Sequence, residues 1–184
     1  DGILYIARGF SWAYLYMSTT EVLTVSTAVN NKYQFFETLD ATSPTLYGNG
    51  AANTIRSTVN PINGGTAWSN PATTIDTAEW SITGLKCVQS MLYIFKGNRP
   101  FYLDTSGNVK TLTGMTQTLA STTGGAGTTE FSGKMYIPYG RGLLEYDIAN
   151  TAFDWKQPSN YGIGFSGTFA GLAGDDRYLY AAVL

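Results

Sequence analysis

The sequence contains no histidine, and its 184 residues include a single cysteine, Cys87. The absence of histidine excludes the Ser-His-Asp and Cys-His arrangements of nucleophilic catalysis, and also the zinc and iron sites of the common kinds. A single cysteine excludes a disulfide within the chain. Cys87 lies in the apolar run ITGLKCVQS, and we predict a small buried residue there rather than a reactive thiol.

Charge is also scarce, because only 13% of the residues are charged and the formal net charge is -2. About a quarter is usual for soluble domains. No basic patch indicates nucleic-acid binding, and no apolar stretch is long enough to span a membrane. The polar residues are mainly Thr, Ser, Asn and Gly. Such an uncharged surface favours a location outside the cytosol.

The sequence does contain a repeat with a period of about 43 residues. An aliphatic residue followed by tyrosine recurs in strand-like segments, and successive tyrosines are 42, 46, 43 and 44 residues apart. These tyrosines are Tyr5, Tyr47, Tyr93, Tyr136 and Tyr180. Two further markers keep the same phase. Asp104 and Asp147 end strand-like runs 43 residues apart, and Trp68 and Trp155 lie 87 residues apart, or two periods.

Each period divides into four strand-like runs that are separated by turn residues. The clearest repeat consists of ITGLKCVQ, MLYIFKG, PFYLDTSG and NVKTLTG. Four short strands with tight turns match the length of one propeller blade, and no segment has helical periodicity. We therefore predict an all-β fold, namely a β-propeller of four-stranded antiparallel blades, of which this chain holds about 4.5.

The predicted blades belong to a single propeller domain and span residues 1–32 (partial), 33–81, 82–126, 127–166 and 167–184 (partial). The chain begins and ends within strand-like runs, DGILYIARGF and DDRYLYAAVL. We therefore expect it to be a fragment that is completed by further blades of the same polypeptide or by a partner.

The periodic residues are predicted to form the scaffold. Because alternate strand residues point to opposite faces, Leu92 and Ile94 should face one neighbouring blade, and Tyr93 and Phe95 the other. Trp68 and Trp155 recur with the repeat and are likewise predicted to pack in the core or at the blade edge.

The periodic aspartates lie where strands enter turns. There the carboxylate of Asp104 or Asp147 can accept backbone N–H hydrogen bonds, while Gly107 or Asn150 takes positive φ. Calcium binding by DTSGN is the alternative, but this segment has only part of the calcium-loop pattern. The adjacent Asp175 and Asp176 are predicted to form a charged hairpin turn before Tyr180.

Residues outside the repeat are the better candidates for ligand or partner contact. Trp12 and Trp80 are out of phase with the periodic tryptophans and could stack on a sugar. Asn60 and Asn63 lie in NPINGG, a turn-rich segment that we place at a blade rim. No catalytic residue, cofactor site or metal site is predicted. Glycoside hydrolysis requires only two carboxylates, so a pair such as Glu37 and Glu130 across blades stays open.

The run ITGLKCVQSMLYIFKGNRPFYLDTSGNVKTLTG, followed by GKMYIPYGRGLLEYD, resembles the divergent β-propeller repeats of tail-associated and other virion proteins of tailed bacteriophages. The resemblance covers most of the chain and implies a virion component without a catalytic residue. The chain lacks the Gly-His…Trp-Asp signature of WD40 repeats and the Asp-box of sialidases, and the kelch-like double glycine of NPINGG does not recur in every predicted blade.

These observations predict a non-enzymatic structural or binding β-propeller in a bacteriophage virion. Its partners would be other virion proteins, further blades of the same polypeptide or a host-surface glycan. The alternative is a secreted bacterial propeller that binds carbohydrate, or that acts on it as a carboxylate-pair glycoside hydrolase or lyase. A protein-interaction scaffold inside a cell is a third possibility.

Overall fold

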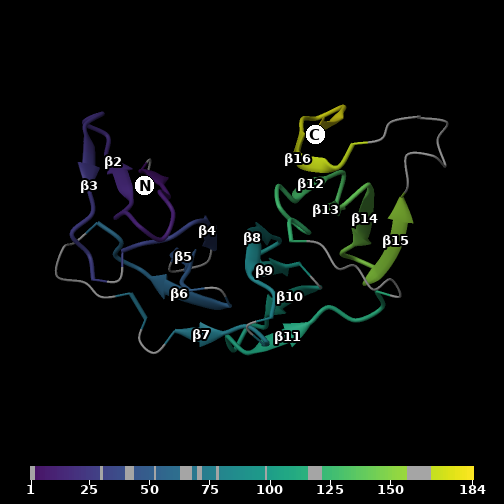
Figure 1. Ribbon diagram of the computed structural model, residues 1–184, viewed down its shortest axis with the longest axis horizontal. Helices are drawn as coiled ribbons and strands as arrows, with labels where there is room; N and C mark the ends of the chain where they lie inside the picture. Colours follow the sequence, from purple (N-terminus) through teal and green to yellow (C-terminus); the bar gives the residue numbers. More distant parts are fainter. Residues whose placement is uncertain are drawn as a thin grey trace. The chain divides into compact units, whose positions relative to one another are not determined.

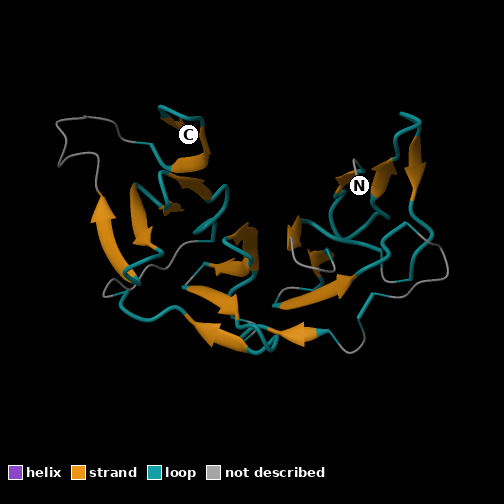
Figure 2. Cartoon of the chain, turned by 180° about the vertical axis from the view of Figure 1, so that it is seen from behind, coloured by secondary structure: helices purple, strands orange, loops and turns teal. Residues whose placement is uncertain are grey.

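The computed structural model describes residues 3–29, 31–39, 44–51, 53–62, 68–69, 72–77, 79–97, 99–115, 122–156 and 167–184. All regular elements in these ranges are β-strands, as Figure 2 shows, and no helix occurs among them. Accordingly, no helix of the described part is long and apolar enough to cross a membrane. Contacts divide the chain into two compact units: a first unit, Asp1–Glu79, and a second unit, Trp80–Leu184.

The first unit contains two antiparallel sheets whose strands follow one another in chain order (Figure 1). The three-stranded sheet consists of β1 (Leu4–Ile6), β2 (Leu15–Met17) and β3 (Leu23–Val25). The four-stranded sheet consists of β4 (Phe36–Leu39), β5 (Thr45–Asn49), β6 (Thr54–Thr58) and β7 (Thr73–Thr74).

The second unit contains two four-stranded antiparallel sheets and a hairpin, again with neighbouring strands in chain order. One sheet consists of β8 (Ile82–Val88), β9 (Met91–Lys96), β10 (Pro100–Leu103) and β11 (Val109–Thr111). The next consists of β12 (Thr129–Phe131), β13 (Lys134–Tyr139), β14 (Gly142–Asp147) and β15 (Ala152–Lys156). The hairpin pairs β16 (Phe169–Gly174) with β17 (Leu179–Val183).

The repeat seen in the sequence corresponds to a repeat in strand register. In each four-stranded sheet the periodic tyrosine lies on the second strand, opposite a residue of the first strand and a residue of the third. Tyr93, for example, is opposite Lys86 on β8 and Tyr102 on β10. The prediction of an all-β fold with four-stranded antiparallel sheets is thus confirmed. The division of the chain into blades stays a prediction.

The core of the second unit lies between its two four-stranded sheets. Tyr93 and Phe95 contribute from β9, whereas Met135 and Ile137 contribute from β13, and all four are almost fully buried. Alternation along β9 places Leu92 and Ile94 on the opposite face, where they are buried too. Both faces of this sheet are therefore apolar, as the sequence predicted.

The periodic tyrosines are less uniformly buried than the scaffold prediction requires. Tyr93 is buried, but the Tyr136 hydroxyl donates a hydrogen bond of 3.0 Å to Glu145, whose other carboxylate oxygen lies 2.6 Å from the Lys134 ammonium. This polar face keeps Tyr136 half-buried. Tyr180 is 54% exposed, because its two-stranded sheet offers fewer neighbouring side chains. For Tyr180 the prediction of core packing is wrong.

The turn interpretation of the aspartates is confirmed. Asp104 Oδ1 accepts the backbone N–H groups of Ser106 and Asn108 at 3.0 and 2.8 Å, and Gly107 has a φ of +79°. Asp147 accepts the N–H of Asn150 at 3.0 Å. The positive φ in that turn belongs to Thr151, however, and not to Asn150 as predicted.

The predicted turn at Asp175 and Asp176 is also confirmed, because it joins β16 to β17. Asp175 Oδ1 accepts the N–H groups of Arg177 and Tyr178, each at 2.7 Å. Its other oxygen accepts the Tyr180 hydroxyl at 2.8 Å.

Candidate functional site

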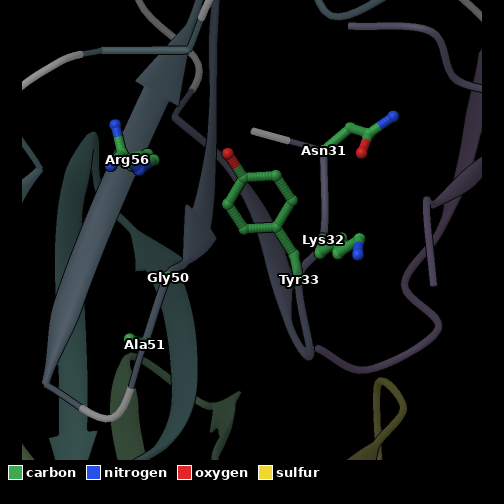
Figure 3. A pocket seen from close by; sticks show the side chains of 6 residues that line it. All are labelled: Asn31, Lys32, Tyr33, Gly50, Ala51 and Arg56. Atoms are coloured by element: carbon green, nitrogen blue, oxygen red, sulfur yellow. The ribbon is translucent and has the colours of Figure 1, made fainter. Parts of the chain in front are cut away.

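The first unit contains a hollow of about 350 Å³ that combines positive charge with a buried hydroxyl group (Figure 3). We call it the Arg56 pocket. Three parts of the chain form it: the segment between β3 and β4, the turn between β5 and β6, and the middle of β6. The lining residues are Asn31, Lys32, Tyr33, Gly50, Ala51 and Arg56.

Local hydrogen bonds hold the segment before β4 against the end of β5. The side-chain oxygen of Asn49, which is buried, accepts the backbone N–H groups of Gln34 and Phe35 at 3.0 and 2.7 Å. The carboxamide of Asn31 donates a hydrogen bond of 2.7 Å to the Ser26 carbonyl. Because these contacts anchor the segment on both sides, Tyr33 has a defined position.

Tyr33 lies flat against β5 and reaches into an aromatic cluster. A Cβ atom at Gly48 would lie 2.6 Å from Tyr33 Cδ1, so only glycine permits this close approach. The ring centroid of Tyr33 is 4.3 Å from that of Trp68 and 5.4 Å from that of Phe36. Trp68 is 1% exposed, so its predicted role in the core is confirmed. The side chain of Trp155 lies outside the described residues.

The hydroxyl group of Tyr33 is buried and has no hydrogen-bond partner among the described residues. Leaving such a group unpaired costs about 1–3 kcal/mol. Burial raises the pKa of Tyr33 well above its usual range, and the nearby positive charge of Arg56 offsets only part of that effect. The phenol is therefore neutral at physiological pH and can donate a hydrogen bond.

Arg56 and Lys32 give the pocket its charge. One guanidinium nitrogen of Arg56 donates a hydrogen bond to the Ser69 carbonyl, which fixes the plane of the group. Lys32 is exposed, and no acidic side chain is among the lining residues. The first unit has six acidic and only three basic side chains, and two of those three basic side chains line this pocket.

Such an arrangement is suited to binding an anion. The lining residues contain no carboxylate, thiol or serine hydroxyl. The described side chains of this lining can donate hydrogen bonds to a ligand and orient it.

The structure does not bring the sequence-predicted contact residues into this pocket. Trp12 is 62% exposed, and the Arg8 guanidinium lies 5.4 Å from its ring centroid. Asn60 is exposed, and its backbone N–H donates to the Thr58 hydroxyl at 3.1 Å. Trp80 is half-buried and belongs to the second unit. Asn63 lies outside the described residues. A contact role for these four residues stays a prediction.

Sequence reasoning missed the residues of the Arg56 pocket. Two signals could have indicated them. Tyr33 is a tyrosine outside the 43-residue phase, and Lys32 and Arg56 are two of very few cations in the first 79 residues. Neither signal shows that the two segments meet, because Tyr33 and Arg56 are separated by two strands.

A second hollow, of about 330 Å³, lies in the second unit between β8 and β12. Lys86 and Glu130 both line it, so its charges balance. Cys87 also lines this hollow at the end of β8 and is half-buried, so it is less buried than the sequence predicted.

Glu37 and Glu130 belong to different units, and a carboxylate pair formed by them stays a prediction. Glu130 accepts the backbone N–H of Gly133 at 2.9 Å, which stabilises the turn between β12 and β13. Among the described residues, no group of three or more His, Cys, Asp or Glu side chains could hold a metal ion. Both oxygens of Asp104 accept hydrogen bonds from Asn108, as the turn interpretation requires.

The chain shares its fold with part of a bacterial extracellular protein. Two crystal structures of the extracellular domain of BT4673 from B. thetaiotaomicron, described as a one component system and as a hybrid two component system, each match with a TM-score of 0.64. Identity is 14%, and the match covers 99% of this chain but 24% of theirs. No protein-family model and no curated protein matches the sequence.

Proposed function

We propose that this chain is part of a β-propeller that acts outside the cell as a binding module and does not transform its ligand. The Arg56 pocket carries this proposal, because it places two cations and an unpaired buried hydroxyl beside loops that connect successive strands. Loops on a rigid β scaffold are common positions for binding residues. The repeated register of the four-stranded sheets supports the propeller architecture.

Several observations support a location outside the cell. The structures with the same fold are extracellular domains, and the chain has little charge. A bacteriophage virion is one such setting, and only the resemblance of the repeats supports it. A secreted bacterial protein is the alternative, and the extracellular neighbours agree with it.

Further blades of the same polypeptide, or another protein of the same assembly, are proposed partners of the first sheet. Leu4, Leu23 and Val25 lie on its strands and are each at least half exposed. Side chains of this type stabilise a fold when a neighbouring sheet covers them, by about 25 cal/mol for each Å² of apolar surface buried.

A ligand screen tests the binding proposal. The full chain is heated with a panel of neutral sugars, sugar acids, simple carboxylates and inorganic anions, and Tm is recorded. A ligand at about 100 times its Kd stabilises the protein by roughly 2.7 kcal/mol. We expect at least one anionic compound to raise Tm in the wild type and in Arg8→Met, but not in Arg56→Met. Arg8→Met is the matched control, since it removes the third cation of the first unit, which does not line the pocket.

Two results contradict the proposal. If no compound raises Tm, or if the increase persists in Arg56→Met, the Arg56 pocket is not a binding site. If incubation with glycans releases products, the chain is an enzyme, and the carboxylate-pair alternative is preferred.

A further inference from the structure

We propose that the Arg56 pocket binds the carboxylate of a small hydroxylated acid, such as a sugar acid. Arg56 and Tyr33 would bind the carboxylate oxygens, and Asn31 and Lys32 would contact the rest of the molecule. This inference rests on the proposed binding function and specifies its ligand.

The distribution of charge points to an anionic ligand. The first unit has an excess of three negative charges, yet the lining of the pocket contains two cations and no carboxylate. Arg8, the third cation, lies over the ring of Trp12. The Arg56 pocket is thus a positive site within an acidic unit, which favours an anion and disfavours a cation.

The donor groups favour a carboxylate. The hydrogen bond from Arg56 to the Ser69 carbonyl orients the guanidinium, and its remaining N–H groups have no described partner. A fixed, planar guanidinium matches the two oxygens of a carboxylate. Figure 3 shows the Tyr33 hydroxyl pointing away from Lys32, toward the side of the pocket on which Arg56 lies. One oxygen could accept from Arg56 and the other from Tyr33.

The unpaired hydroxyl of Tyr33 is a second feature of the pocket, independent of its charge, that favours a carboxylate ligand. Because the phenol is neutral and buried, a carboxylate oxygen is a strong acceptor for its proton, and the resulting hydrogen bond is charge-assisted. Binding would therefore satisfy a donor that the protein leaves unpaired.

The remainder of the lining is suited to hydroxyl groups. The Asn31 side chain donates to the Ser26 carbonyl, and its own oxygen has no described partner. Lys32 adds an exposed ammonium group. A hollow of about 350 Å³ is within the range of small-molecule pockets, so a single sugar ring that carries a carboxylate is a suitable occupant.

The test is a ¹H–¹⁵N NMR titration of the full chain, with the backbone amides of Gly50 and Ala51 as reporters. Galacturonate and glucuronate are the probes, whereas galactose, lactate and sulfate are the controls. We expect saturable shifts with the two uronates. Galactose lacks the carboxylate and sulfate lacks the sugar ring, so each should bind at least about tenfold more weakly.

Matched variants assign the contacts. Arg56→Lys keeps the charge but removes the planar donor group, and Tyr33→Phe removes one hydroxyl. Each should weaken uronate binding by about tenfold or more. The controls Arg8→Lys and Tyr5→Phe make the same changes in the same unit, and Tyr5 packs at the edge of the same aromatic cluster. Neither control should change the Kd.

The outcomes separate this inference from the proposal on which it rests. If sulfate or galactose binds as tightly as the uronates and still requires Arg56, the carboxylate inference is wrong while the binding function is retained. If lactate binds as tightly as the uronates, recognition of the carboxylate is supported, but the requirement for a sugar ring is contradicted. If the uronates bind equally to Tyr33→Phe and to the wild type, the role given to Tyr33 is wrong. If none of these compounds binds, the carboxylate inference is wrong, and the Tm screen with its wider panel decides the binding function separately.

Discussion

Each unit of the protein has a deeply buried tyrosine beside its core, but the two hydroxyl groups have different surroundings. In the second unit, Tyr139 is 2% exposed and donates a hydrogen bond of 3.0 Å to the Lys96 carbonyl. In the first unit, Tyr33 is 1% exposed and its hydroxyl has no partner among the described residues. Buried polar groups in native proteins are usually paired, so the unpaired one requires an explanation.

The surroundings of the two hydroxyl groups explain why one is paired and the other is not. Tyr139 lies in an apolar cluster between two sheets, where its hydroxyl connects β13 of one sheet with β9 of the other. Tyr33 lines a hollow that also contains Arg56 and Lys32. The comparison indicates that the core of the second unit serves as scaffold, whereas the aromatic cluster of the first unit supports a binding site. The following predictions test this difference, from the largest expected effect to the smallest.

The largest effect is expected in the scaffold core. Ile137 is fully buried on β13, so Ile137→Ala leaves a cavity and should lower the free energy of unfolding by about 2–5 kcal/mol. Ile137→Val should cost about 0.5–1.5 kcal/mol. Urea denaturation measures both changes. Equal stability of the two variants would show that this core can rearrange around the missing atoms, contrary to a rigid scaffold.

The paired hydroxyl should stabilise the second unit. Tyr139→Phe removes the hydrogen bond that the Tyr139 hydroxyl donates to the Lys96 carbonyl in the core. We expect the free energy of unfolding to fall by about 0.5–1.5 kcal/mol, as measured by urea denaturation. Unchanged stability in Tyr139→Phe would show that the hydrogen-bonded hydroxyl of Tyr139 stabilises the fold no more than the unpaired hydroxyl of Tyr33.

Removing the unpaired hydroxyl of Tyr33 should not lower the stability of the protein. Tyr33→Phe removes a buried donor without leaving an unpaired acceptor among the described residues, so stability without ligand should be unchanged or should rise by up to about 1 kcal/mol. The same denaturation measurement, made beside Tyr139→Phe, gives the sign. A clear loss of stability in Tyr33→Phe would show that its hydroxyl has a partner and would weaken the case for the pocket.

The aspartate turns give the second unit a predicted dependence on pH. Hydrogen bonds to the charged form lower the pKa of Asp104, Asp147 and Asp175, chiefly those from Asn108, Asn150 and Arg177, respectively. Because the folded pKa lies below the unfolded value of 3.8, these carboxylates stabilise the fold above pH 3.8. This stabilisation should be lost as the pH falls through the folded pKa values.

Two neighbouring residues provide a matched test of this mechanism. Asp175→Asn removes a carboxylate that accepts two backbone hydrogen bonds, whereas Asp176 forms none that is described in the structure. At pH 7 we expect a lower Tm for Asp175→Asn than for Asp176→Asn, although both variants lose one charge. Equal Tm values would indicate that charge alone, and not the turn hydrogen bonds, accounts for the effect.

Sequence reasoning located the strands and turns well, because both depend on short-range patterns. The continuous apolar run around Leu92 and Tyr93 predicts a strand that is buried on both faces, and the structure has one there. Asp104 and Gly107 predict a turn from residue types three positions apart. The exposure of Tyr180 could not be predicted, because it depends on which strands are adjacent to β17.

The sequence by itself therefore determined the all-β class, the 43-residue repeat and the aspartate turns, since strands and turns are encoded within a few consecutive residues and the repeat is their recurrence along the chain. Only the tertiary structure decided the position of the candidate site. The Arg56 pocket joins residues 31–33 to residues 50–56, which are about 20 positions further along the chain. It forms because Asn49 anchors the segment that contains Tyr33 and Gly48 leaves room for the Tyr33 ring. Contacts of this kind are absent from any local pattern, because they arise when β5 and β6 pack against the segment before β4.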